Sequence, residues 1–210
     1  MKAGAGELFI GLDLGQKLDF STFAVVERLL GSLLRRLERL NLNTPYPAVA
    51  AHARDLLGKT ANHGNAKLVI DATGVGAPVL DLLHAQGVCP VAITITAGRS
   101  VSGAGPHFHV PKRVLMRTLA ALFGAGRFKI ASGIPNSAEL IEELLNLQAK
   151  IDRRTRQDSY GAKGKQKHDD LVLALALAIW YGEKERADGG EQADDGRREK
   201  DEHPEASRIV

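Results

Sequence analysis

Short apolar runs bounded by turn residues dominate the first part of the chain and predict buried β-strands. The run LFIGLD, residues 8–13, is closed by Gly and Asp, as expected of a buried strand. Segments 22–29 and 32–42 follow at hairpin distances. The Leu and Arg residues of 32–42 alternate imperfectly, so their spacing also fits a helix. The short connection and the Gly-Ser turn before this segment favour a third antiparallel strand.

Strands and helices alternate after these three segments. Residues 44–59 begin with Thr and two early prolines and have a Gly near their end, which is typical of a helix. AKLVIDATG, residues 66–74, is a second buried strand with Asp71 at its end. The further expected elements are helix 76–86, strand 88–96, helices 111–124 and 136–149, an exposed hairpin or loop over 151–167, and an apolar helix 170–182. Three meandering strands followed by strand–helix alternation predict an α/β fold, with a mixed sheet flanked by helices.

The end of the chain has a different composition. Residues 187–207 contain almost no large apolar side chains, so burial cannot offset the entropy of ordering them. We therefore predict one domain over residues 1–183 and a disordered charged tail over 184–210. From Glu183 onward there are 6 Lys and Arg against 10 Asp and Glu, and the rest of the chain has 22 against 15. A basic body with an acidic tail indicates a polyanionic partner.

Composition also excludes several classes of protein. A single cysteine, Cys89, rules out a disulfide framework and a cysteine-based zinc site, and fits a reducing cytoplasm. The first residues, MKAGAGELF, lack the apolar stretch of a secretory signal. The longest apolar run, residues 171–181, is too short to span a bilayer. We expect a cytoplasmic protein without a membrane partner.

Acidic residues stand where rigid elements end. Asp13 closes the first strand and Asp71 the fourth, and Asp169 and Asp170 open the last helix. In open α/β sheets, ligands bind in the cleft at the carboxyl ends of the strands. Each acid also has a purely structural explanation: an Asp at a helix start commonly caps the helix, and an Asp beside Gly commonly forms a turn. Acids at all three converging ends favour a functional site.

Such a cluster calls for a cation. Carboxylates brought together without one repel, and at least one becomes protonated. Carboxylate and water oxygens are hard ligands that suit Mg²⁺ or Mn²⁺ better than Zn²⁺. Two such ions, about 4 Å apart, can bind the attacking and leaving oxygens of a phosphodiester. The pattern therefore predicts metal-dependent phosphodiester hydrolysis at these carboxylates.

Five segments in order resemble the nuclease domain of the large terminase subunit of tailed bacteriophages, over roughly residues 8–182. They are GLDLGQKLDFSTFAVVE, VIDATGVGAPVLDLL, VPKRVLMRTLAALFGAGRFKI, ELIEELLNL and KHDDLVLALALAIW. The resemblance implies an RNase H-like fold, shared with Holliday-junction resolvases and integrases. It also implies an enzyme, a metal-dependent endodeoxyribonuclease that cleaves double-stranded DNA during genome packaging. The implied setting is the cytoplasm of a bacterial host, with a small terminase subunit and a portal as further partners.

The resemblance also assigns residues. Asp13 and Asp71 match metal ligands, the Asp169/Asp170 pair supplies a third without telling which of the two, and Asp19 matches an additional acid for a second metal. Lys112 stands where the family commonly has a lysine, and a phosphate contact is expected of it. Two features depart from the family. Leu173 occupies a position that often holds a further Asp, and the chain has no G-x-x-x-x-G-K-[ST] motif. A packaging ATPase is therefore expected on another chain or in a part that is missing here.

A basic segment precedes the acidic pair. Its six cations are expected to contact DNA phosphates without reading base sequence, although a solvated loop has the same composition. They are Arg153, Arg154, Arg156, Lys163, Lys165 and Lys167. His168 follows this segment directly, and it could bind metal, move a proton or only cap the helix.

Two other functions fit parts of the pattern. GLDLGQKLDFST resembles the first phosphate-binding hairpin of the actin, Hsp70 and sugar-kinase class of ATP-binding proteins, but that class has two lobes and little chain remains after residue 182. A non-catalytic DNA-binding module is the other alternative, kept open by Leu173.

Overall fold

A computed structural model of the chain describes residues 6–15, 19–61, 65–152, 157–162 and 169–201. Among these residues, an eight-stranded mixed sheet runs through the centre of the fold in the order β6-β7-β5-β4-β1-β2-β3-β8. Its strands are β1 (Glu7–Asp13), β2 (Thr22–Arg28), β3 (Ser32–Arg39), β4 (Ala66–Asp71), β5 (Val91–Thr96), β6 (Ser102–Ala104), β7 (His107–Pro111) and β8 (Phe128–Ile130). A separate antiparallel pair consists of β9 (Leu147–Asp152) and β10 (Gln157–Ala162).

Strand pairing follows the predicted order. β1, β2 and β3 form an antiparallel meander, and β4 then pairs with β1 in parallel. β5 extends the sheet beside β4, and β7 lies parallel to β5. The prediction of an α/β fold with three antiparallel strands followed by parallel ones is confirmed.

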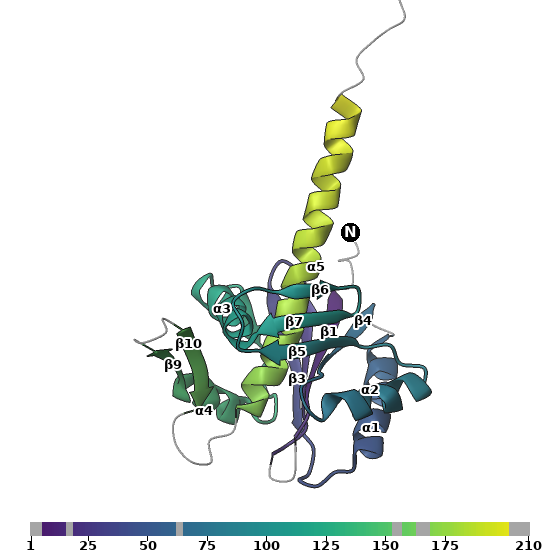
Figure 1. Cartoon of the computed structure of the whole chain (residues 1–210), viewed down its shortest axis with the longest axis vertical. Helices are drawn as coiled ribbons and strands as arrows, with labels where there is room; N and C mark the ends of the chain where they lie inside the picture. Colours follow the sequence, from purple (N-terminus) through teal and green to yellow (C-terminus); the bar gives the residue numbers. More distant parts are fainter. Residues whose placement is uncertain (1–5, 16–18, 62–64, 153–156, 163–168, 202–210) are drawn as a thin grey trace, which may run out of the picture.

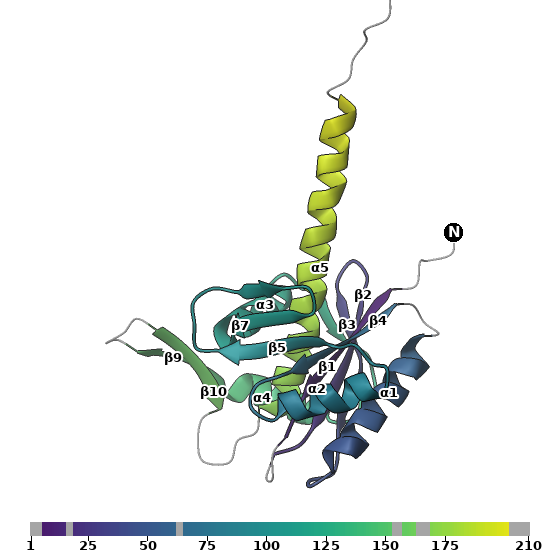
Figure 2. The same ribbon diagram turned by 45° about the vertical axis from the view of Figure 1, so that its right-hand side comes forward.

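Helices cover both faces of this sheet, as Figures 1 and 2 show. α1 (Tyr46–Ala61) and α2 (Gly76–Ala85) pack on one face, over a core that includes Ile10, Leu12 and Ile70. α3 (Lys112–Gly124), α4 (Ser137–Asn146) and the first part of α5 (Asp170–Asp201) pack on the other. The two apolar layers explain why the central strands read as continuous apolar runs instead of alternating ones.

α5 is the central helix of its face. Every residue from Asp170 to Tyr181 is buried, because this stretch crosses β1 and β2 and also packs against α3. The crossing is close at Gly11 in β1, where an added methyl group would collide with the carbonyl of Ala174. A residue without a side chain therefore lets the helix approach the strand.

This crossing gives a stability prediction. Gly11→Ala is expected to destabilise the fold by about 1–3 kcal/mol or more, because overpacking a rigid backbone contact costs that much. Gly58→Ala in α1 is the matched control, since nothing lies within 4 Å of the added methyl group, and it is expected to stabilise by up to about 1 kcal/mol. Urea unfolding of both variants checks this. Equal stability of the two would contradict the close crossing.

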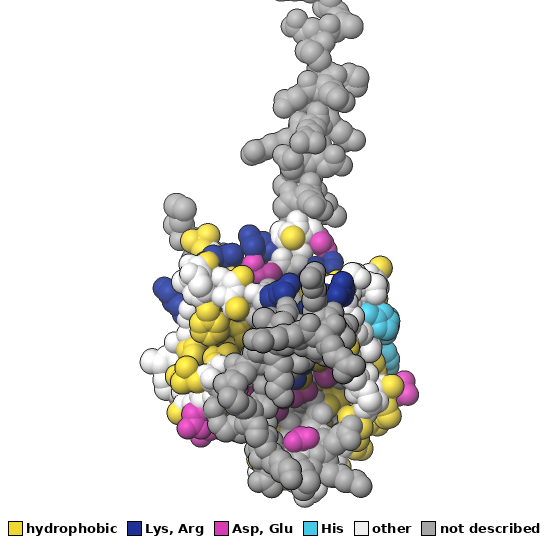
Figure 3. Space-filling view, turned by 60° about the vertical axis from the view of Figure 1, so that its left-hand side comes forward, with side chains coloured by type: hydrophobic (Ala, Val, Ile, Leu, Met, Phe, Trp, Pro, Cys, Tyr) yellow, Lys and Arg dark blue, Asp and Glu magenta, His cyan; other side chains and the backbone are white. Residues whose placement is uncertain are grey.

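Beyond residue 182 the helix leaves the body of the domain (Figure 1). Helical structure continues to Asp201, past the end predicted from the apolar pattern. Glu183 pairs with Arg127 at 3.4 Å and with Arg186 at 2.6 Å, and Lys184 pairs with Asp188 one turn on. On the face in Figure 3, Lys and Arg side chains gather near the base of this protruding part. The division into a domain over residues 1–183 and a disordered tail over 184–210 stays a prediction.

Other differences from the predicted elements are local. The short strands β6, β7 and β8 lie in segments for which no element was predicted. The predicted helix 136–149 ends at Asn146, and β9 starts at Leu147. β9 and β10 pair antiparallel, in agreement with a hairpin in this region. In the part of the chain that the structure describes, no helix has the length and apolar character needed to cross a membrane.

Candidate active site

Two carboxylates meet at one end of the sheet because their strands are parallel neighbours. In the β1–β4 pair, Leu12 lies opposite Ile70. The next residues, Asp13 and Asp71, are the last residues of their strands and therefore lie side by side at this end of the sheet. Each follows a buried strand, so packing of the preceding apolar residues fixes where the carboxylate lies.

The start of α5 brings a third acidic element to the same place. Asp13 pairs across the β1–β2 hairpin with Thr22, and the hydroxyl of Thr22 donates a hydrogen bond to Asp170 Oδ2 at 2.5 Å. The N–H of Leu173 donates to the carbonyl oxygen of Asp169 at 2.9 Å, which makes Asp169 the residue that caps the helix. The three predicted acidic ends thus lie near enough for their charges to interact.

The charges of these groups are strongly coupled. Burial raises the pKa of Asp13 well above its ordinary value of 3.8, and the carboxylates of Asp71, Asp170 and Asp169 raise it further. Burial also raises the pKa of Asp71, opposed by hydrogen bonds from Thr73. The N–H of Thr73 donates to Asp71 Oδ1 at 2.8 Å. An excess of negative charge at this edge of the sheet is the result.

Two cations from the chain offset part of that charge. Lys112, the first residue of α3, places Nζ 2.6 Å from Asp169 Oδ2, and it lowers the pKa of both Asp13 and Asp71. Arg39, at the end of β3, binds Asp170. In the described ranges, no group of three His, Cys, Asp or Glu side chains lies close enough together to hold a metal ion.

The two adjacent aspartates differ in their surroundings. The side chain of Asp170 is 5% exposed, and both of its oxygens accept hydrogen bonds, from Thr22 and from Arg39. The side chain of Asp169 is 29% exposed, with Lys112 as its partner. Asp169 is thus the member of the pair that is open to a ligand from solution, a distinction that the sequence alone did not make.

Arg39 and Glu143 are part of this arrangement and were not among the predicted site residues. Arg39 Nη2 binds Glu143 Oε1, and Glu143 Oε2 accepts the N–H of Val172 in the first turn of α5 at 3.1 Å. Burial raises the pKa of Glu143 to about 7, with a further contribution from the nearby Asp170 carboxylate. In the sequence, Glu143 is visible only as an acidic residue between Leu140 and Leu144 on the predicted helix 136–149.

The remaining predicted residues fall elsewhere. Asp19 lines a neighbouring hollow of about 210 Å³, with Gly15, Asn41 and Tyr46 among the other lining residues. Leu173 is buried in the core. The basic segment and His168 lie outside the described residues: Arg153, Arg154, Arg156, Lys163, Lys165, Lys167 and His168.

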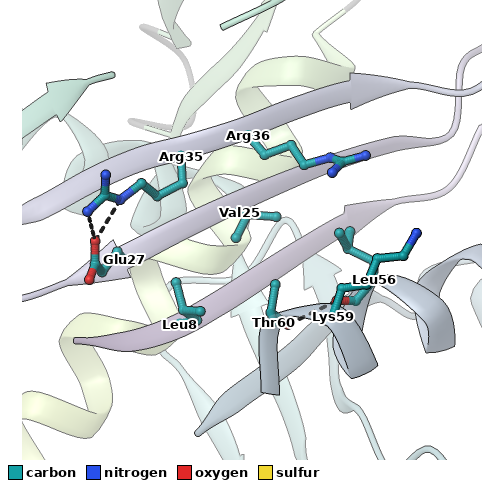
Figure 4. Close-up of a pocket in the computed structure, with 8 residues that line it drawn as sticks. All are labelled: Leu8, Val25, Glu27, Arg35, Arg36, Leu56, Lys59 and Thr60. Atoms are coloured by element: carbon teal, nitrogen blue, oxygen red, sulfur yellow. Dashed lines mark hydrogen bonds and ion pairs between the residues drawn. The ribbon is translucent and has the colours of Figure 1, made fainter. Parts of the chain in front are cut away.

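A larger hollow, of about 520 Å³, lies between α1 and the β1–β3 strands (Figure 4). Its basic side chains include Arg35, which pairs with Glu27, and Arg36, which pairs with Glu38. Asp13, Asp71, Asp169 and Asp170 are not among its lining residues. It is lined by Leu8, Val25, Glu27, Arg35, Arg36, Leu56, Lys59 and Thr60.

No protein-family profile matches the chain. The chain is 31% identical over 182 residues to the large terminase subunit of Thermus virus P23-45, a match that covers 86% of this chain and 32% of that protein. The large terminase subunit of Thermus phage G20c is likewise 31% identical over 182 residues. The chain thus spans about a third of the length of the curated relatives it matches.

Solved structures agree with the sequence match. The large terminase nuclease of the thermophilic phage G20c with bound magnesium superimposes with a TM-score of 0.61 at 28% identity, covering 83% of this chain and 80% of that one. The nuclease domain of the large terminase subunit of bacterial virus Sf6, solved with manganese, has a TM-score of 0.59 at 18% identity and covers 85% and 89%. The second match supports the fold alone.

Proposed function

We propose that this chain, which is related in sequence and fold to the nuclease domains of terminase large subunits, is a divalent-metal-dependent nuclease that hydrolyses DNA. The observation that carries this proposal is the electrostatic coupling of Asp13 with Asp71, Asp170 and Asp169 at one edge of the sheet, which together with burial raises the pKa of Asp13. Such a cluster favours a bound cation, since a cation removes the repulsion.

The donor set suits Mg²⁺ or Mn²⁺. Carboxylate oxygens are the ligands these ions prefer, and the related nuclease domains were solved with magnesium and with manganese. Asp13, Asp71 and Asp169 would hold the metal, and Asp170 would support Asp169 from its buried position. We propose two ions, and a place for Asp19 at the second. When bound, divalent ions polarise the phosphodiester and lower the pKa of an attacking water.

The side chains themselves orient and balance charge. Asp71 keeps its orientation through the bond from Thr73. Lys112 neutralises Asp169, and with that carboxylate engaged by metal its ammonium would be released toward a phosphate oxygen. His168 follows Lys167 directly before Asp169 and stands as an auxiliary candidate.

The proposed substrate is double-stranded DNA, cut internally during genome packaging. This fits the excess of Lys and Arg over Asp and Glu before residue 183. The basic segment Arg153–Lys167 would hold phosphates beside the carboxylates. A packaging ATPase, a small terminase subunit and a portal are the proposed partners, in the cytoplasm of a bacterial host.

Cleavage of supercoiled plasmid tests this function. The chain is expected to nick and linearise plasmid in millimolar Mn²⁺ and to leave it intact in EDTA, as followed on agarose gels. Plasmid that stays supercoiled with Mn²⁺ but is retarded by the protein would indicate a non-catalytic DNA-binding module instead. Equal cleavage with Mn²⁺ and with EDTA would contradict metal dependence.

A further inference from the structure

Arg39 joins three elements beside the candidate metal site. Its guanidinium approaches Asp170 with two nitrogens, Nε at 2.8 Å from Oδ2 and Nη2 at 3.1 Å from Oδ1. Nη2 also binds Glu143 on α4. The Phe20 ring lies 5.1 Å from the guanidinium carbon. Arg39, at the end of β3, thus contacts both the start of α5 and the middle of α4.

The network is largely shielded from solvent. The side chains of Arg39, Glu143 and Asp170 are 18%, 9% and 5% exposed. Glu143 also contacts α5, because its carboxylate accepts a hydrogen bond from the N–H of Val172. The hydroxyl of Thr22 on β2 donates a hydrogen bond to Asp170. All four oxygens of the Asp170 and Glu143 carboxylates therefore accept hydrogen bonds.

The forked guanidinium matters for this arrangement. Its planar array of donors can serve two carboxylates at once, whereas a lysine offers a single compact charge. Without Arg39, two buried carboxylates would face each other with no counter-charge, and buried charges left unpaired are strongly unfavourable. The first turn of α5, which carries Asp169, would then have to move.

We propose that Arg39 is a positioning residue for the metal site: by holding Asp170 and Glu143 together, it fixes the first turn of α5 so that Asp169 faces Asp13 and Asp71. This inference rests on the proposed function, because it concerns the geometry of the same carboxylates. It assigns Asp170 to support of the site and Asp169 to the ligand set.

Three single variants test it: Arg39→Met, Arg39→Lys and Arg36→Met. Arg36 is the matched control, an arginine on the same strand whose 51% exposed side chain pairs with Glu38 at the surface. Mn²⁺ affinity is measured by titration calorimetry without DNA. Arg39→Met is expected to weaken Mn²⁺ binding by about 10- to 100-fold, the usual effect of removing a group that orients a metal ligand. The Mn²⁺ affinity of Arg39→Lys is expected to lie between those of Arg39→Met and the wild type. Arg36→Met is expected to bind Mn²⁺ as tightly as the wild type.

A second measurement needs no metal. Amide hydrogen exchange at Val172 and Leu173 in the metal-free protein is expected to be faster in Arg39→Met than in Arg36→Met, because the first turn of α5 is held less firmly. If Arg39→Met does not fold, Arg39→Lys, which keeps the charge, carries both measurements.

The outcomes separate this inference from the proposed function. Folded Arg39 variants with wild-type Mn²⁺ affinity, even with a lower melting temperature, would reduce Arg39 to a structural residue and overturn the inference. A wild-type protein that neither binds Mn²⁺ nor cleaves DNA would refute the proposed function itself.

Discussion

Replacing Asp71 by Asn is expected to lower Mn²⁺-dependent plasmid cleavage by about three orders of magnitude, equivalent to about 4 kcal/mol of activation free energy, while the fold stays intact. The amide has the same shape, and its oxygen can still accept the hydrogen bond from Thr73. What would be lost is the negative charge that we propose holds a divalent ion beside β1 and β4. Initial nicking rates on supercoiled plasmid give the measurement.

Asp81→Asn is the control for this variant. Asp81 is an exposed acid on α2, so its loss changes the net charge by the same amount without touching the cluster. Cleavage by Asp71→Asn at the rate of Asp81→Asn would remove Asp71 from the site. Far-ultraviolet circular dichroism and a thermal melt show whether either variant has altered the fold.

Mn²⁺ is expected to raise the melting temperature. An ion that binds only the folded state, present at about 100 times its dissociation constant, stabilises by about 2.7 kcal/mol. For a chain of this size that corresponds to about 5–11 °C. Differential scanning fluorimetry with Mn²⁺ and with EDTA measures the shift. Asp13→Asn is expected to lose most of it, and an unchanged shift in that variant would place the bound ion elsewhere.

The shift should also depend on pH, in a direction fixed by Asp13. The unfolded chain releases the Asp13 proton near the ordinary pKa of 3.8, whereas burial and the neighbouring carboxylates keep it on the folded chain to higher pH. The folded state binds more protons in that window, so metal-free stability falls as pH rises through it. A bound ion replaces the proton. The Mn²⁺-induced shift is therefore expected to be larger at pH 8 than at pH 5.5.

The positions of the acids could be predicted because strand ends are visible in a sequence. Asp13 and Asp71 each follow a buried apolar run, and parallel pairing of those runs brings the two side chains to one edge. Asp169 and Asp170 open the most apolar helix of the chain, which has to lie across the sheet. Local patterns and one rule of α/β topology were therefore sufficient for the cluster.

The supporting residues could not be predicted in the same way. Arg39 ends a strand whose other arginines, Arg35 and Arg36, are half-exposed and paired at the surface. A register shift in the β2–β3 pairing leaves no β2 residue directly opposite Arg35. Strand alternation in the sequence does not reveal this shift. Glu143 looks like any other acid on an amphipathic helix. Their roles depend on contacts between residues more than 100 positions apart, which a local pattern does not contain.

The close crossing of α5 over Gly11 limits how this protein can be redesigned. A slip of the helix by one residue along the strand would turn it by about 100° about its own axis, carrying both aspartates away from their partners. Many combinations of Leu, Ile and Val would fill the same layer, so the apolar half of α5 is open to rebuilding. Its register is not, because the carbonyl of Ala174 lies where a side chain at position 11 would be.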